Sequence, residues 1–327
     1  MAPHHKQLVD LLSLIKCQGY QFITTTPGTH EHYLRTNTQA NNLRDIFGWN
    51  LPFAIELIPQ LNTILFDTGM IERCGELWRS RIRISSLGND LFLHSAFPTT
   101  ESDAIFFGPD TYRFARFIRH CLEVDKQFFL NNSNRPLGIL DIGCGTGAGG
   151  ITAIRALPAG KPYEITMSDI NSTALDLMQA NAQASGIPVK LLQGDIIEVL
   201  QEKFDLIIAN PPFMRDDSGR SYRDGGEQLG LALSIRMFIK AFEQLALGGK
   251  LIIYTGVAMT SSIDPFLSAI TLFLEKKKCT WSYEEIDPDI FGDELQKPAY
   301  AKAHRIAAVG LVVDKPFIQP VSKPRLK

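Results

Sequence analysis

From Leu137 onward, short apolar segments alternate with longer amphipathic segments, and this alternation limits the folds that the chain can adopt. The strand-like segments are residues 137–142, 163–169, 189–193, 204–209 and 251–255. The helix-like segments that follow them are residues 151–157, 173–185, 229–247 and 263–277. Such alternation is typical of βαβ crossovers, which build a parallel sheet with helices on both faces. The sequence therefore predicts an α/β fold with a doubly wound, mainly parallel sheet and an antiparallel C-terminal hairpin formed by residues 280–286 and 306–313.

The residues before this alternation have a different pattern. Helical periodicity occurs in 8–15, 42–46 and 59–71, and two strand-like segments, 78–85 and 91–94, follow around the turn residues Gly88 and Asn89. We therefore expect a small N-terminal α+β domain over residues 1–105, a connecting segment over 106–136 that ends in the polar cluster 131–136, the α/β domain over 137–314, and a flexible proline-containing tail over 315–327.

Composition excludes several classes of protein. Apolar residues make up 45% and charged residues 21% of the chain, as in ordinary globular proteins. The chain has no apolar run near the roughly 18 residues of a membrane span and no signal-peptide core, so we expect a cytoplasmic protein with no membrane partner. Its five cysteines are scattered without a C-x-x-C pair, which predicts neither disulfides nor a metal site.

The net charge of -2 argues against a surface built entirely for phosphate backbones. Two local groups of arginines could still contact RNA phosphates. One alternates along a predicted strand, and the other recurs every three residues along a predicted helix: Arg79, Arg81 and Arg83, and Arg113, Arg116 and Arg119. A solvated charged face is the commoner meaning of such a pattern, so RNA contact is one of two interpretations.

A glycine-rich loop follows the first strand of the α/β domain, and it predicts the cofactor. The stretch runs from Asp141 through Gly143, Cys144 and Gly145 to Gly147, where glycine lets the backbone approach a ligand closely. Residues 145–150 also fit the G-x-G-x-x-G pattern of dinucleotide-binding loops, which leaves a dehydrogenase as a remote alternative. Asp141 would oppose a pyrophosphate but suits the cationic sulfonium and amino groups of S-adenosyl-L-methionine, which is therefore the expected cofactor.

Acids also end the next two strands. Asp169 is placed to accept the ribose hydroxyls, and Asp195 to accept from the adenine amino group; the apolar residues after them, Ile170 and Ile196, are assigned to the same cofactor site. With these motifs, residues 137–313 resemble the class I methyltransferases. The resemblance implies a Rossmann-like sheet, and it maps the family's ribose-binding and adenine-binding acids onto Asp169 and Asp195.

The fourth strand runs directly into Asn210-Pro211-Pro212-Phe213, the predicted catalytic tetrapeptide. Two prolines fix the backbone, so the Asn210 side-chain oxygen and the Pro211 carbonyl can both accept hydrogen bonds from one NH2 group, while Phe213 stacks on a planar substrate. In-line methyl transfer would then depend mainly on positioning. An ordinary turn after a strand is the alternative. The tetrapeptide resembles that of class I amine and amide N-methyltransferases, whose acceptors are glutamine in release factors, adenine N6 and guanine N2 of ribosomal RNA.

Two flanking segments bear on the acceptor. The glycine-containing loop at Asp224-Gly225-Gly226 and the segment from Pro109 to Thr111 resemble features of release-factor glutamine methyltransferases, and Thr111 is added to the cofactor site on that resemblance. The resemblance implies a protein substrate, such as a translation factor, methylated on glutamine. The chain departs from those enzymes at Phe213, where they usually carry Tyr. N-methylation of a base in ribosomal or transfer RNA therefore stays open, as does a non-catalytic regulator that binds S-adenosylmethionine.

Overall fold

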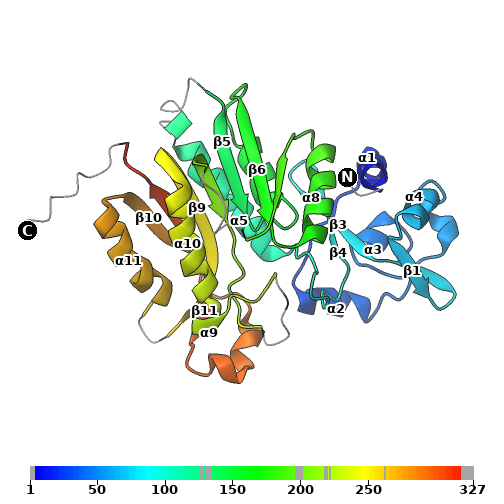
Figure 1. Cartoon of the computed structure of the whole chain (residues 1–327). Helices are drawn as coiled ribbons and strands as arrows, with labels where there is room; N and C mark the ends of the chain where they lie inside the picture. The colour runs from blue at the N-terminus through cyan, green and yellow to red at the C-terminus, as the bar shows by residue number, and fades with distance from the viewer. Residues whose placement is uncertain are drawn as a thin grey trace, which may run out of the picture.

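The computed structural model describes residues 4–125, 128–129, 135–195, 202–216, 220, 222–260 and 263–317. Within this part of the chain, seven strands form one sheet in the order β10-β11-β9-β8-β5-β6-β7 (Figure 1). Five neighbouring strands are parallel: β5 (Leu137–Ile142), β6 (Tyr163–Asp169), β7 (Lys190–Gln193), β8 (Phe204–Ala209) and β9 (Leu245–Met259). The antiparallel hairpin of β10 (Thr280–Asp287) and β11 (Arg305–Asp314) extends the sheet beyond β9. The predicted α/β fold with a C-terminal hairpin is confirmed.

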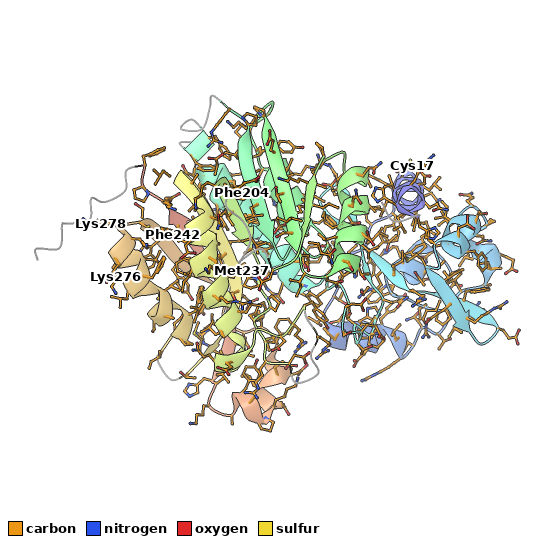
Figure 2. The ribbon with its side chains drawn as sticks, in the orientation of Figure 1. Cys17, Phe204, Met237, Phe242, Lys276 and Lys278 are labelled. Atoms are coloured by element: carbon orange, nitrogen blue, oxygen red, sulfur yellow. The ribbon has the colours of Figure 1, made fainter. Side chains whose placement is uncertain are left out.

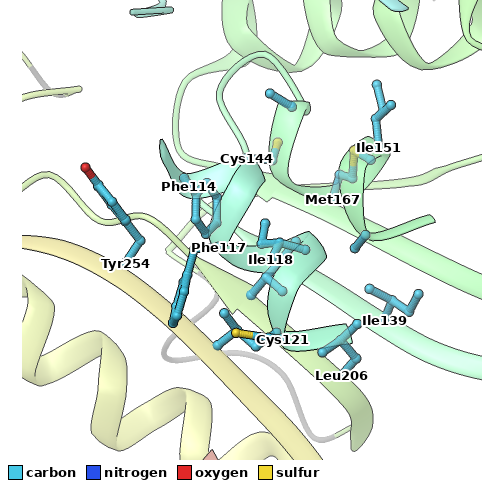
Figure 3. Packing of buried hydrophobic residues seen from close by; sticks show 14 of the residues in the cluster. Phe114, Phe117, Ile118, Cys121, Ile139, Cys144, Ile151, Met167, Leu206 and Tyr254 are labelled. Atoms are coloured by element: carbon cyan, nitrogen blue, oxygen red, sulfur yellow. The ribbon is translucent and has the colours of Figure 1, made fainter. Parts of the chain in front are cut away.

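Successive residues of each central strand enter different hydrophobic cores, because side chains alternate across a sheet. In β5, Leu137 and Ile139 belong to one cluster, whereas Leu140 and Ile142 belong to the other. The first face is covered by α5 (Pro109–Val124), α7 (Ala148–Arg155) and part of α8 (Ser172–Ala184), and the second by α10 (Ala232–Gln244) and α11 (Pro265–Lys277). Figure 3 shows Phe114, Phe117 and Ile118 of α5 packed over this first face. Burial on both faces explains the nearly continuous apolar sequence of these strands.

The N-terminal residues form a separate layer beside α8, on the side of the sheet away from α11 (Figures 1 and 2). Its helices are α1 (His5–Cys17), α2 (Pro27–Leu34), α3 (Leu43–Phe47), η1 (Ile55–Leu57) and α4 (Asn62–Asp67). Its strands pair as two antiparallel ribbons, β1 (Ile71–Cys74) with β2 (Leu77–Ser80), and β3 (Ile82–Leu87) with β4 (Asp90–Ser95). The described residues contain no helix long and apolar enough to cross a membrane.

Two polar contacts fix β4 to the α/β sheet. Asn181 of α8, which is fully buried, accepts a hydrogen bond from the Leu93 N–H (2.8 Å) and donates to the carbonyls of Leu93 (3.2 Å) and Thr146 (3.0 Å). Arg155 at the end of α7 makes a two-pronged ion pair with Asp90 (2.8 and 2.9 Å). The N-terminal residues are therefore tied to the glycine-rich loop itself, because Thr146 belongs to that loop.

Several local expectations are wrong. The strand predicted over 78–85 is two strands from different ribbons, because the chain bends at Arg81. Arg79, Arg81 and Arg83 therefore share no face: Arg81 is exposed and lies 4.0 Å from Glu72, whereas Arg83 is buried and donates to the Gly48 carbonyl (2.8 Å).

The lengths of three predicted segments also differ from the structure. The helix predicted over 59–71 is only α4, and residues 71–74 form β1. The helix predicted over 229–247 comprises part of α9 (Glu227–Gly230), α10 and the start of β9. Helix α2 was missed, although Thr26 as N-cap and Pro27 in the first turn mark its start. The domain boundaries stay a prediction, and residues 131–134 of the polar cluster and 318–327 of the tail lie outside the described residues.

Candidate active site

A cavity opens at the carboxyl ends of β5, β6, β7 and β8, where open α/β sheets bind their ligands. Most of the residues that the sequence assigned to the site line it: Thr111, Asp141, Gly143, Cys144, Gly145, Asp169, Ile170, Asp195, Asn210 and Pro212. Three of them do not, namely Gly147, Pro211 and Phe213, and Ile196 lies outside the described residues. The described residues include no cluster of His, Cys, Asp or Glu able to hold a metal ion.

Asp141 is a buried carboxylate at the base of this cavity. Its Oδ2 accepts a hydrogen bond from the N–H of Gly150 in the first turn of α7 (2.8 Å), and only 2% of the residue is exposed. Burial raises its pKa to about 7; the negative charge of Asp169 adds to the rise, and the Gly150 N–H opposes it. A cation placed in the cavity would favour the ionised form, so Asp141 fits a positively charged ligand.

The loop after Asp141 must turn sharply beside the cavity. Gly143 and Gly145 have φ values of 65° and 51°, in the left-handed region that glycine adopts readily, and an added Cβ at either position would meet open space. At Gly150 the need is steric, since a Cβ there would lie 3.2 Å from Asp141 Oδ2 and 2.5 Å from Met167 Cε. The first two glycines shape the loop, and the third lets α7 approach the sheet.

The other two predicted acids differ in their surroundings. Asp169 accepts hydrogen bonds from the N–H groups of Gly145 and Asn171 (both 2.9 Å), and burial raises its pKa despite these contacts. Asp195 is partly exposed and lies 3.3 Å from Arg236 of α10. Beside them Ile170 is 59% exposed, which leaves an apolar side chain available to cover a flat ring. Asp169 is thus held rigidly, whereas the contact of Asp195 with the described residues is a surface ion pair.

Thr111 contributes to the cavity wall from the start of α5. Its hydroxyl accepts from the Gly108 N–H (3.2 Å) and so caps the first turn of the helix. The neighbouring Asp110 points the other way and accepts a hydrogen bond from the Tyr254 hydroxyl of β9 (2.6 Å). This second contact ties the start of α5 to the sheet and fixes the position of Thr111.

The tetrapeptide after β8 presents one unsatisfied polar atom. The side-chain oxygen of Asn210 is inaccessible to solvent and has no hydrogen-bond partner among the described residues. Asn210 and Pro212 line the same cavity as the glycine-rich loop. Buried acceptors are normally paired, so an unpaired one at a cavity is a place for a ligand N–H.

Phe213 packs on the sheet beside the cavity and does not line the cavity itself. Its ring packs on β9 at Gly256, where an added Cβ would overlap the ring, and its centroid is 6.0 Å from that of Phe291. The ring therefore contacts β9 and Phe291, and it is not among the residues that line the cavity. Stacking of Phe213 on a planar substrate, and with it a catalytic role, stays a prediction.

The loop that contains Asp224, Gly225 and Gly226 folds back on the tetrapeptide. The Met214 N–H donates to the Arg223 carbonyl (3.0 Å), and the Gly225 N–H donates to the Met214 carbonyl (2.7 Å). A Cβ on Gly225 would lie 2.7 Å from the Pro212 carbonyl oxygen and would overlap the Gly230 carbonyl. Glycine is required here because two backbones meet, which gives this loop a supporting role for the tetrapeptide.

Sequence reasoning missed an aromatic pair in the cavity wall. Phe106 and Tyr222 are stacked with centroids 5.8 Å apart and an interplanar angle of 4°, and the Tyr222 hydroxyl donates to the Thr99 carbonyl (2.9 Å). They come from segments more than 100 residues apart, so no local pattern could have joined them.

One face of α10 was missed as well. Leu233, Arg236 and Met237 line the cavity, and Figure 2 shows Met237 on this helix. Their i, i+3, i+4 spacing was a usable signal, because it puts all three on one helical face.

The doubly wound sheet, with an acid-and-glycine cavity at its carboxyl edge, has a Rossmann-like fold. Residues 117–278 match the model of the methyltransferase small domain family. This region, just under half of the chain, is therefore similar to the methyltransferase small domain, and its cofactor is S-adenosyl-L-methionine.

Curated relatives of two kinds match the chain. The release factor glutamine methyltransferase of Lactococcus lactis is 27% identical over 53% of this chain and 64% of its own length. The ribosomal RNA small subunit methyltransferase C of Sodalis glossinidius is 32% identical over 41% of this chain and 35% of its own length. The chain thus spans less than two thirds of either relative. Among solved structures, the M. jannaschii tRNA m1G37 methyltransferase is 16% identical, with a TM-score of 0.45 over 72% of this chain and 57% of that one.

Proposed function

We propose that this protein is an S-adenosylmethionine-dependent methyltransferase, that it transfers the methyl group to a planar NH2 nitrogen, and that the acceptor is the side-chain amide of a glutamine in a protein. The observation that carries the proposal is the buried, unpartnered side-chain oxygen of Asn210, a residue that lines the cavity together with Asp141 and Asp169. An acceptor NH2 that donates a hydrogen to this oxygen would hold its nitrogen lone pair toward the donor methyl.

The donor supplies an electrophilic methyl on a sulfonium. The residues of the chain orient and stabilise: Asp141 and Asp169 hold the cationic donor, and Asn210 and the rigid Pro211-Pro212 backbone fix the NH2 group. The nitrogen would bond to the methyl carbon as the carbon–sulfur bond breaks, the sulfur would leave as a neutral thioether, and the methylated nitrogen would release its proton to water. Positioning is the main catalytic contribution in this scheme, because the cavity needs no general base for it.

Two observations support protein over RNA. The arginines at 79, 81 and 83 do not form a phosphate-binding face, and Arg113 is paired with Asp110 (3.3 Å) and Asp287 (2.8 Å). A base in ribosomal or transfer RNA is the second candidate, supported by the exposed Arg116 and Arg119 on α5. Curated relatives of both kinds match the chain.

The test is transfer of a tritiated methyl group from the donor into extract of a strain that lacks this protein. Label that survives RNase and is lost with protease would support the glutamine proposal, and the reverse would establish an RNA acceptor. Asn210→Ala should lower the transfer rate about 100-fold or more, because a misplaced nucleophile costs that much. Calorimetry should give an unchanged affinity for S-adenosylhomocysteine. A wild type that binds this product but transfers no methyl would indicate a non-catalytic binding protein.

A further inference from the structure

The connection between β10 and β11 is a structured segment, not a tight turn. It spans residues 288–304, whereas hairpin loops usually have about two to five residues. It contains two 3-10 helices, η2 (Gly292–Gln296) and η3 (Pro298–Tyr300), drawn in orange beside α9 in Figure 1. Its apolar side chains join the core cluster that also holds Phe213 and Met214: Ile290, Phe291, Leu295, Ala299, Tyr300 and Ala303.

An ion pair joins this segment to the loop behind the tetrapeptide. Arg223 lies 2.6 Å from Glu294, and their side chains are only 17% and 13% exposed. Lys297 lies 2.7 Å from the other carboxylate oxygen of Glu294, and the Arg223 guanidinium carbon lies 5.6 Å from the centroid of the Phe291 ring. Because this pair is shielded from water, removing one partner leaves the other charge without compensation. The loss of an exposed surface pair costs much less, because water solvates the remaining charge.

Two further contacts reach the tetrapeptide itself. Phe291 packs beside Phe213, and the buried Tyr300 hydroxyl accepts a hydrogen bond from the Arg215 N–H (2.8 Å). Phe291 has a φ of 53°, a left-handed conformation that bulky residues adopt only where the surroundings hold it. The segment therefore contacts the tetrapeptide and its loop from the side opposite the cavity.

None of the residues that line the donor cavity comes from 288–304. We propose that this segment is a positioning element for the acceptor, in which Glu294 holds Arg223, and thereby the backbone of Gly225 over Pro212, while Phe291 holds Phe213. The proposal rests on the proposed acceptor role of the tetrapeptide. In this proposal, binding of the acceptor depends on the Arg223–Glu294 ion pair, whereas binding of the donor does not.

The test compares Glu294→Gln with Glu285→Gln. Glu285 is a matched control, because it pairs with Arg305 at 2.8 Å on the same hairpin but is 37% exposed and forms no ion pair with the described residues of the loop. Initial rates are measured with tritiated donor against increasing amounts of the acceptor extract. Glu294→Gln should raise the half-saturating amount of extract about tenfold and leave the dissociation constant for S-adenosylhomocysteine within about twofold, whereas Glu285→Gln should change neither. The proposal would be overturned if both variants changed the half-saturating amount of extract equally. It would also be overturned if Glu294→Gln weakened S-adenosylhomocysteine binding as much as it raised that amount.

Two further measurements distinguish a loss of acceptor positioning from general destabilisation of the fold. They also distinguish it from failure of the proposed function. The charge exchange Arg223→Glu with Glu294→Arg should restore most of the acceptor affinity that Glu294→Gln loses. Hydrogen exchange should speed up about tenfold at the Met214 and Gly225 amides in Glu294→Gln alone, because both donate within the loop. If the wild type transfers no methyl, the proposed function fails, and unchanged exchange at these amides would then refute the positioning element by itself.

Discussion

Replacing Asp141 by Asn should stabilise the free protein and weaken its hold on the donor. Burial raises the pKa of Asp141 from 3.8 to about 7, so ionisation of this group is disfavoured in the folded state. Each unit corresponds to about 1.36 kcal/mol, which gives a cost of up to about 4 kcal/mol. Between these two pKa values the unfolded chain has lost the proton and the folded chain retains it, so wild-type stability falls as pH rises from about 4 to about 7. Asn cannot ionise, yet its oxygen can still accept from the Gly150 N–H.

The assay is urea unfolding of both proteins without ligand between pH 4 and pH 8. The free energy of unfolding of Asp141→Asn relative to wild type should rise by up to about 4 kcal/mol over this range, with most of the rise complete by pH 7. At pH 8 the variant should bind S-adenosylmethionine about tenfold more weakly or worse, since a charged partner in a buried site is lost. A stability difference that stays constant with pH would show that Asp141 is not held protonated in the free protein, and the reasoning would be wrong.

Two further predictions concern the supports of the cavity. Gly225→Ala should lower methyl transfer while leaving S-adenosylhomocysteine affinity unchanged in calorimetry, because its Cβ would overlap the Gly230 carbonyl on the acceptor side; equal loss of both would contradict this. Asn181→Ala should lower the free energy of unfolding by about 3 kcal/mol in urea, since it leaves buried groups of Leu93 and Thr146 unpaired, and should also weaken product binding. A loss below about 0.5 kcal/mol would mean that water replaces these contacts.

The α/β part of the fold could be predicted because its signals are local. The apolar runs of β5, β6 and β8 were placed at their observed bounds, since each is largely buried on both faces and has an acid or an asparagine at its end or next to it. The N-terminal strands could not be placed as well. The run from Trp78 to Ser85 looks like one alternating strand, and only tertiary packing bends it at Arg81 and buries Arg83 against the Gly48 carbonyl.

In the candidate site, too, the part set by local sequence could be predicted and the part set by tertiary contacts could not. The donor side depends on residues next to strand ends, and Asp141, Asp169 and Asp195 all line the cavity as the sequence predicted. The acceptor side depends on contacts between distant segments. Neither the stacking of Phe106 on Tyr222 nor the pair of Arg223 with Glu294 follows from spacing, because the partners are joined only by the folded sheet.

The donor side and the acceptor side of the site are held by different contacts. The glycine loop is fixed by contacts inside the sheet and by Asn181 of α8, so a change in the acceptor loop can leave the donor site intact. The tetrapeptide is held between the Gly225 backbone and the Phe291 ring, neither of which contacts the donor cavity. Substitutions in residues 288–304 should therefore change which acceptor is methylated more readily than whether the donor binds. Because Asn210 holds the acceptor in this proposal while Asp141 and Asp169 hold the donor, its replacement should separate methyl transfer from donor binding.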